Sequence, residues 1–263
     1  MHLATQPDVW KTAITDTSQG SLVVRGVEIT EAMEKLSFGA MVYLLWKGIP
    51  PKPAEARLMD AILVSSVDHG TTPPSSLATR VVMSGGNPLN AAVAAGILAI
   101  GDSHGGAIEA CAKIYQMWLN TRDEIPDMTQ MASIIVQEFQ EKQKRIPGYG
   151  HRVYKRDPRT LKLIDIAERE KLRGRALDLA LAIQDELEKH SGGKPLPLNV
   201  DGITAALMTD MGFHWGLGKG FFLLSRCAGL VAHAHEERTR EKPMRPFGQT
   251  KPEYDGPRNT PLS

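Results

Sequence analysis

The sequence predicts an all-α fold, and three observations on its 263 residues lead to this prediction. Apolar residues recur at helical spacing in one segment after another. Capping residues stand where these segments begin, and glycine or proline stands where they end. We find no repeat, no low-complexity tract and no convincing β-sheet pattern, although residues 21–26 are compatible with a short strand or turn.

The first half of the chain is expected to form short capped helices after an irregular or extended stretch over residues 1–20. Thr30 is expected to cap a helix over residues 31–36. Ser37 is expected to cap the next helix, over residues 38–47, which Gly48 ends. Helical spacing predicts further helices over residues 54–67, 77–83 and 90–100.

The second half is expected to continue as amphipathic helices. Asp157 and Pro158 form a helix start, with the aspartate as N-cap and the proline at the first helical position. Four further prolines follow Pro243, so an extended C-terminal tail is expected. The helices predicted from spacing cover residues 107–118, 129–144, 161–170, 176–190, 203–211 and 220–239.

Composition narrows the class of protein. The net charge of +1 argues against a dedicated nucleic-acid binder. Cys111 and Cys227 lie in apolar helical patterns, so free thiols in a reducing compartment are the default expectation. The first residues lack a signal-peptide pattern, and the longest apolar run, over residues 89–100, is too short to span a bilayer. We therefore expect a cytoplasmic protein.

The stretch over residues 146–159 concentrates groups suited to chemistry. Gly148 and Gly150 flank Tyr149, so the backbone there can turn tightly or approach a ligand closely. His151 follows on a short loop, beside several permanent cations. A titratable imidazole among cations suits a polyanionic substrate and a proton transfer. A basic surface loop with a capping aspartate is the alternative interpretation. The cations of this stretch are Arg152, Lys155, Arg156 and Arg159.

Other candidate residues lie far away in the sequence. His69 and His104 neighbour glycines at helix ends or in loops, where side chains reach ligands easily. Asp201 follows apolar residues and precedes a glycine, so burial could raise its pKa towards the range useful for proton transfer. Arg226 and Arg245, like Arg159, could clamp substrate carboxylates.

Plainer interpretations exist for several of these residues. Asp68 or Asp102 is more typical of a cap than of a catalyst, and Arg226 could be a buried structural partner. A metal site built from His69, His104 and His151 is conceivable, but no spacing typical of metal ligands supports it. His233 and His235 lie two residues apart on a helix and therefore face different sides.

Taken together and in this order, the motifs resemble the citrate synthase superfamily over nearly the full chain. The run GYGHRVYK at 148–155, followed by DPR at 157–159, is similar to the family's signature loop. The run HGGA at 104–107 is similar to the segment of its other catalytic histidine, and NVD at 199–201 to that of its catalytic aspartate. The substrate-binding residues are matched by DH at 68–69, by Arg226 in SRCAGLVAH, and by Arg245-Pro246 near the tail.

Differences from the citrate synthase pattern indicate which branch of the superfamily this chain resembles. Citrate synthases are much longer and carry several helices where this chain has only the segment 54–67, and the signature loop here is one residue shorter between His151 and Arg159. The runs DHG at 68–70, IGD at 100–102 and NVDG at 199–202 resemble the citryl-CoA lyase module of ATP citrate lyase. His104 is similar to the synthases instead, because the lyase module has phenylalanine there.

The resemblance implies a carbon–carbon lyase that cleaves citryl-CoA, or a close 3-hydroxy-acyl-CoA, to acetyl-CoA and oxaloacetate. Its implied catalytic residues are His104, His151 and Asp201, and its implied carboxylate-binding residues are His69, Arg159, Arg226 and Arg245. Gly148, Tyr149, Gly150 and Lys155 are implied to bind coenzyme A. The alternatives are a compact citrate synthase-type condensing enzyme, which would release free CoA, and a non-catalytic CoA-binding paralogue, which would show no turnover.

The resemblance also implies an architecture and an assembly. A large helical lobe is expected over residues 1–103 and 213–263 and a small lobe over 104–212, closing over the substrate. The CoA thioester is a substrate, and no tightly bound cofactor, metal or redox group is implied. A homodimer or a tetramer of dimers is expected, in which Arg245 reaches a neighbouring subunit's site, with no nucleic-acid or membrane partner.

Overall fold

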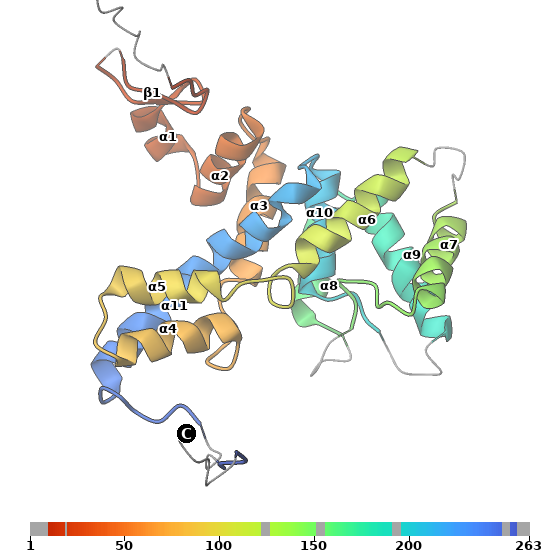
Figure 1. Ribbon diagram of the computed structural model, residues 1–263. Helices are drawn as coiled ribbons and strands as arrows, with labels where there is room; N and C mark the ends of the chain where they lie inside the picture. The colour runs from red at the N-terminus through yellow and green to blue at the C-terminus, as the bar shows by residue number, and fades with distance from the viewer. Residues whose placement is uncertain are drawn as a thin grey trace, which may run out of the picture.

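The computed structural model describes residues 10–18, 20–121, 127–150, 156–190, 196–248 and 253–256. The chain is built of helices, as the sequence predicts, with one very small sheet near the N-terminus (Figure 1). The first helices are α1 (Ile29–Lys35), α2 (Phe38–Lys47), α3 (Pro53–Ser65), α4 (Pro74–Ser84) and α5 (Leu89–Leu98). They are followed by α6 (Ala107–Thr121), α7 (Met128–Glu141), α8 (Pro158–Arg169), α9 (Arg175–His190), α10 (Val200–Asp210), the 3-10 turn η1 (Trp215–Leu217) and α11 (Gly218–Arg240).

The expectation that no β-sheet is present is wrong on one point. Strands β1 (Thr15–Asp16), β2 (Val23–Val24) and β3 (Val27–Glu28) form an antiparallel sheet in the order β1-β2-β3. Arg25 and Gly26 form the turn between β2 and β3, both with positive φ, which is the backbone of a tight two-residue hairpin. Each strand has two residues, too few to produce a readable alternation in the sequence.

Local capping decides most helix boundaries. Ser37 caps α2 by accepting from the backbone N–H of Ala40, and Gly48 ends this helix with φ of 76°, both as predicted. Asp157 and Pro158 begin α8 in the predicted roles. Thr30 does not cap α1, however, because the helix begins one residue before it.

Helix α10 begins three residues earlier than the predicted start at residue 203. The side chain of Asn199 caps it by accepting from the backbone N–H groups of Asp201 and Gly202, at 3.0 and 3.1 Å. Asp201 therefore lies in the first turn of a helix rather than in an extended approach, and its backbone is fixed by the cap.

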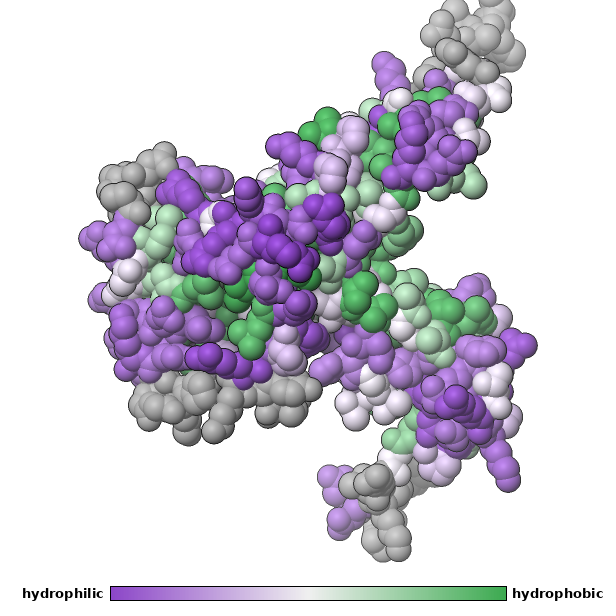
Figure 2. Space-filling model, turned by 180° about the vertical axis from the view of Figure 1, so that it is seen from behind, coloured by the Kyte–Doolittle hydropathy of each residue, from purple (hydrophilic) through white to green (hydrophobic). Residues whose placement is uncertain are grey.

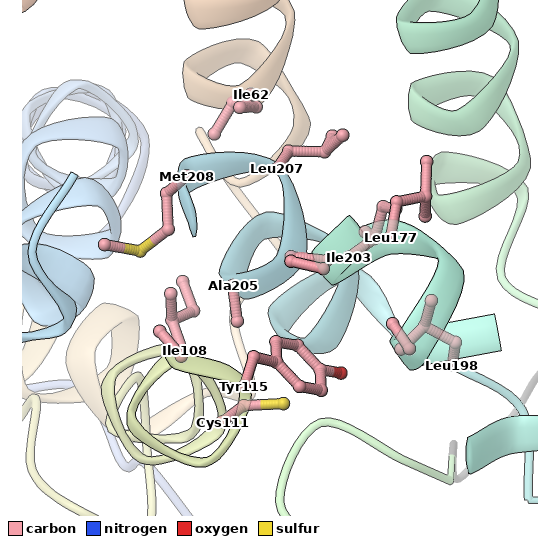
Figure 3. Close-up of a cluster of buried hydrophobic side chains, with 14 of the residues drawn as sticks. Ile62, Ile108, Cys111, Tyr115, Leu177, Leu198, Ile203, Ala205, Leu207 and Met208 are labelled. Atoms are coloured by element: carbon pink, nitrogen blue, oxygen red, sulfur yellow. The ribbon is translucent and has the colours of Figure 1, made fainter. Parts of the chain in front are cut away.

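The main hydrophobic core lies where α6, α10, α9 and α3 meet (Figure 3). Ile203 of α10 lies between Tyr115 of α6 and Leu177 of α9, and Leu207 of α10 lies on the side of Ile62 of α3. Each fully buried aliphatic side chain of this kind contributes roughly 1.5–3 kcal/mol to the free energy of unfolding. The core therefore fixes α10, and with it the first turn that carries Asp201.

Helix α11 crosses the molecule and joins this core to an arm formed by α4, α5 and its own C-terminal half (Figure 1). A small hydrophobic cluster of Met83, Ala92 and Ala234 lies in that arm, together with buried polar side chains of α4 such as Thr79 and Arg80. A second arm, formed by the small sheet with α1 and α2, leaves the body elsewhere, and a gap separates the two arms (Figure 2). The division into two lobes at residues 104–212 stays a prediction. No helix in the described part of the chain has the length and apolarity needed to cross a membrane.

Candidate active site

Two of the three predicted substrate arginines contact the C-terminal end of α3. Arg226 Nε donates to the carbonyl of Ser66 at 3.1 Å, and Arg159 Nη1 lies 3.5 Å from the carbonyl of Ser65. The last carbonyls of a helix carry partial negative charge and lack partners within the helix, so they attract cations. Two arginines that are distant in the sequence are therefore held at one point of the fold.

Arg226 has a donor to spare. Its side chain is buried, with 3% of the residue exposed, and its guanidinium lies 4.7 Å from the ring centroid of Phe222. The Nη1 group has no hydrogen-bond partner among the residues that the structure describes. Burial lowers the pKa of Arg226, opposed by the charges of Asp68 and Asp201. A buried guanidinium with an unused N–H is a ready site for a substrate carboxylate, so the purely structural interpretation of Arg226 does not account for all its donors.

Arg159 is held by a carboxylate that the sequence analysis treated only as a cap. Asp157 pairs with it through both oxygens, at 3.0 Å to Nε and 2.8 Å to Nη2. The same carboxylate also caps α8 by accepting from the backbone N–H of Arg159 at 3.0 Å. Asp157 is 1% exposed, so it orients the guanidinium from the protein side.

His104 lies in a tight loop before α6 and contacts a residue that the sequence analysis missed. Its Nε2 lies 2.8 Å from the hydroxyl of Ser75, a fully buried residue in the first turn of α4. Burial lowers the pKa of His104, and the positive charges of Arg226 and His69 lower it further. The imidazole is therefore neutral near pH 7 and can donate one hydrogen bond to a ligand. Pro73 and Pro74, which open α4, were the only local signal for Ser75.

The signature loop is joined to the start of α10 by backbone pairing. Gly150 donates to the carbonyl of Pro197 at 2.8 Å, and Asn199 donates to that of Gly148 at 3.0 Å. Gly148 has φ of +83°, and a Cβ on it would lie 2.7 Å from the Cα of Gly202. Both its conformation and the close approach require glycine here. This packing places the residues just before position 151 against the helix turn that carries Asp201.

Asp201 has the electrostatic environment expected from its apolar neighbours. Burial raises the pKa of its carboxyl group, the charges of Arg159 and Arg226 oppose this, and Asp157 adds to the rise. Those three residues are the same groups that gather at the end of α3. Asp201 thus lies within electrostatic range of both arginines, and its carboxyl group retains its proton at higher pH than an exposed aspartate does.

The side chain of Tyr149 makes structural contacts, and its predicted role in coenzyme A binding stays a prediction. Its hydroxyl lies 2.8 Å from that of Tyr115 and donates to the carbonyl of Ala180 at 3.0 Å. Burial raises its pKa well above the ordinary value. Its side chain therefore anchors the loop of residues 148–150 to α6 and α9.

Four predicted residues remain, and two of them belong to the described part of the chain. His151 and Lys155 lie outside the described residues. His69 is exposed on the α3–α4 loop and acts electrostatically on His104. Arg245 lies at the far end of α11, paired with Glu237 at 2.6 and 2.8 Å. Within the described ranges, no three His, Cys, Asp or Glu side chains cluster as metal ligands do.

Comparison with known proteins identifies the family to which this chain is similar. Residues 48–247 match the family described as "Citrate synthase, C-terminal domain". The solved structure of citryl-CoA lyase from Hydrogenobacter thermophilus is 43% identical and superposes with a TM-score of 0.86, over 96% of this chain and 98% of that one. ATP citrate lyase from Methanothrix soehngenii, solved with citrate and coenzyme A, has a TM-score of 0.81 over 96% of this chain and 42% of its own, and its 24% identity shows the fold alone.

A relative of known name agrees with these structures. The ATP-citrate synthase subunit 1 of Sordaria macrospora is 27% identical over 260 residues, which cover 90% of this chain. The chain spans only 37% of the length of that relative. The family match covers most of the chain, including the histidine, aspartate and arginine motifs on which the resemblance rested. The protein belongs to the citrate synthase family.

Proposed function

We propose that the protein cleaves citryl-CoA, or a close 3-hydroxy-acyl-CoA, into acetyl-CoA and oxaloacetate by a retro-aldol reaction. The observation that carries this proposal is the grouping of a neutral, serine-anchored His104, an acid of raised pKa at Asp201, and the unused donor of Arg226. An electrophile, a proton donor and a carboxylate-binding cation are three of the groups that such a cleavage needs from the chain, and a base for the hydroxyl proton is the fourth.

In the proposed reaction, His151 accepts the proton of the substrate hydroxyl as a carbonyl forms there. The carbon–carbon bond to the thioester's α-carbon breaks, and its electron pair enters the thioester as an enolate. If the Ser75 hydroxyl donates to Nε2 of His104, the ring proton is on Nδ1 and can donate to the enolate oxygen. Asp201 then gives its proton to the α-carbon, which yields acetyl-CoA. Its raised pKa supports a protonated resting state.

The charges at the end of α3 suit the dicarboxylic product. We expect Arg226 and Arg159 to bind the carboxylates of oxaloacetate together with His69. The backbone of Gly148 and Gly150 is expected to contact the adenine of coenzyme A. Lys155 is expected to pair with its phosphate.

The cleavage direction is favoured by the 43% identical citryl-CoA lyase, which this chain covers over 98% of its length. The alternative is a condensing enzyme that also hydrolyses the thioester, as the description of the matched family allows. His104 is the residue that favours this alternative, by the resemblance noted above. A non-catalytic CoA-binding paralogue is less well supported, because a binder needs no acid of raised pKa beside an anchored histidine.

We also propose that the protein is a homodimer, or a tetramer of dimers. Helix α5 is apolar on all its sides, yet only Ala92 and Gly96 are buried in it, and Leu98 is 84% exposed. A helix that is hydrophobic all round is normally covered. Hydrophobic residues also face the gap between the arms (Figure 2). We propose that a second copy covers α5 and that the segment of Arg245 then reaches a neighbouring subunit's site, as the family resemblance implies.

Two assays on the purified protein test the proposed function. Citryl-CoA, citramalyl-CoA and malyl-CoA are offered in turn, and for citryl-CoA the oxaloacetate formed is trapped by malate dehydrogenase with NADH. We expect oxaloacetate and acetyl-CoA with little free citrate. In the second assay, acetyl-CoA and oxaloacetate are mixed and free thiol is followed. Rapid, stoichiometric CoA release would make the protein a citrate synthase, and no turnover of any thioester would leave only a binding role.

A further inference from the structure

One face of α11 contacts successive residues of the α3–α4 loop. Arg226 binds the carbonyl of Ser66 at 3.1 Å. One turn on, Gly229 allows close approach of the backbone at Val67, and a Cβ there would also lie 3.2 Å from Asp68. Another turn on, His233 Nε2 lies 2.9 Å from Asp68 Oδ1. The spacing of three and four residues keeps these groups on one helix face, so α11 fixes the segment that immediately precedes His69.

The hydrogen bonds of His233 determine its tautomer. Its Nδ1 lies 3.2 Å from Arg80 Nη1, and a guanidinium has only donors. The Nδ1 atom therefore accepts, and the proton resides on Nε2, where it donates to Asp68. Burial opposes ionisation of Asp68, but hydrogen bonds from the Gly70 backbone and from His233 lower its pKa overall. His233 is 9% exposed and its bond to Arg80 is buried, whereas Asp68 is exposed and the bond between Asp68 and His233 is only partly buried.

The contacts continue from His233 to the tail. Arg80 Nε pairs with Glu237 at 2.7 Å, and Glu237 in turn pairs with Arg245 through both of its oxygens. Arg80 and Glu237 are almost fully buried. An unbroken line of polar contacts therefore connects the loop of His69 with the segment of Arg245.

We infer that His233 is a positioning residue for substrate binding. It does not contact the substrate; it orients the Asp68–His69 segment relative to Arg226, which is on the same helix, and it stabilises Arg80 in its contact with Glu237 and thus Arg245. The inference rests on the proposed function only in taking His69 and Arg226 as carboxylate-binding groups. In this proposal, one buried imidazole fixes the relative positions of His69, Arg226 and Arg245, which come from three separate segments of the chain.

The test compares His233→Ala, His233→Gln and His235→Ala. His235 lies two residues away and is exposed, so its variant is the matched control. Loss of a hydrogen bond to a charged group corresponds to about a tenfold effect, so we expect His233→Ala to raise KM for citryl-CoA about tenfold with kcat within about threefold of the native value. Glutamine can still donate to Asp68 and should restore most of the affinity, since its amide can occupy the place of Nε2.

Two further measurements separate failure of this inference from misfolding of the variant and from failure of the proposed function. If His233→Ala does not fold, a double-mutant cycle of Asp68→Ala and His233→Phe replaces it, because each of these changes removes the hydrogen bond, and strictly additive effects on KM would overturn the inference. Unchanged KM in folded His233→Ala, or a loss of kcat alone, would also overturn it while leaving the proposed function intact. If the native protein does not turn over citryl-CoA, the proposed function fails, and calorimetric binding of oxaloacetate decides the inference: equal affinity of the native protein and His233→Ala refutes it.

Discussion

Ser75→Ala offers a sharp test of the proposed electrophile. The substitution removes one buried oxygen, which lies 2.8 Å from Nε2 of His104, and leaves the helix turn around it unchanged. Leaving the ring nitrogen without its partner in a half-buried site costs about 1–2 kcal/mol. If His104 stabilises the enolate, this cost falls on the transition state, and kcat should drop about 5- to 30-fold. KM should change little, because the ground-state thioester needs that hydrogen bond less.

The neighbouring residue provides the control. Ser76 is as buried as Ser75, stands in the same helix turn, and its hydroxyl has no hydrogen-bond partner within the described ranges. Ser76→Ala should therefore keep native kcat and native or slightly higher stability. The assay is the coupled measurement of oxaloacetate release from citryl-CoA, with thermal unfolding of both variants measured alongside. Equal kcat for the Ser75 and Ser76 variants would refute the role given to the Ser75–His104 contact.

Three further predictions follow from the site. Asp201→Asn should keep its fold and CoA binding but lose at least about a hundredfold in kcat. Because Asp201 must be protonated to act, kcat of the native protein should fall as the pH rises through the raised pKa of Asp201. The residual rate of the variant should not show this fall. Gly148→Ala should lower the free energy of unfolding by about 1–3 kcal/mol, because its φ is +83° and its Cβ would crowd Gly202; a native denaturation midpoint would contradict this. Mixed subunits of Arg245→Ala and Asp201→Asn, each inactive alone, should regain some activity through hybrid sites, and failure after verified subunit exchange would mean that each site is built from one chain.

The fold class and most helices could be predicted from the sequence because the interactions that form and cap a helix are local. Helical periodicity and caps such as Ser37 and Asp157 depend on residues within one turn of each other, so the all-α class and most helices follow from them directly. The family was identified because its motifs occur in order along the chain, and the family match over residues 48–247 confirms it. The raised pKa of Asp201 was expected from its apolar neighbours alone.

The tertiary structure decided what depends on distant partners. Ser75 meets His104, and Asp68 meets His233, only because α4, α11 and the loops between them pack together. Nη1 of Arg226 has no partner among the described residues, and this likewise depends on which carbonyls α3 presents to the guanidinium. Tyr149 turned out to be an anchor because Tyr115 and Ala180 lie within reach of its hydroxyl. A hydrogen bond extends about 3 Å, so its partner is set by the packing of whole helices and not by spacing along the chain.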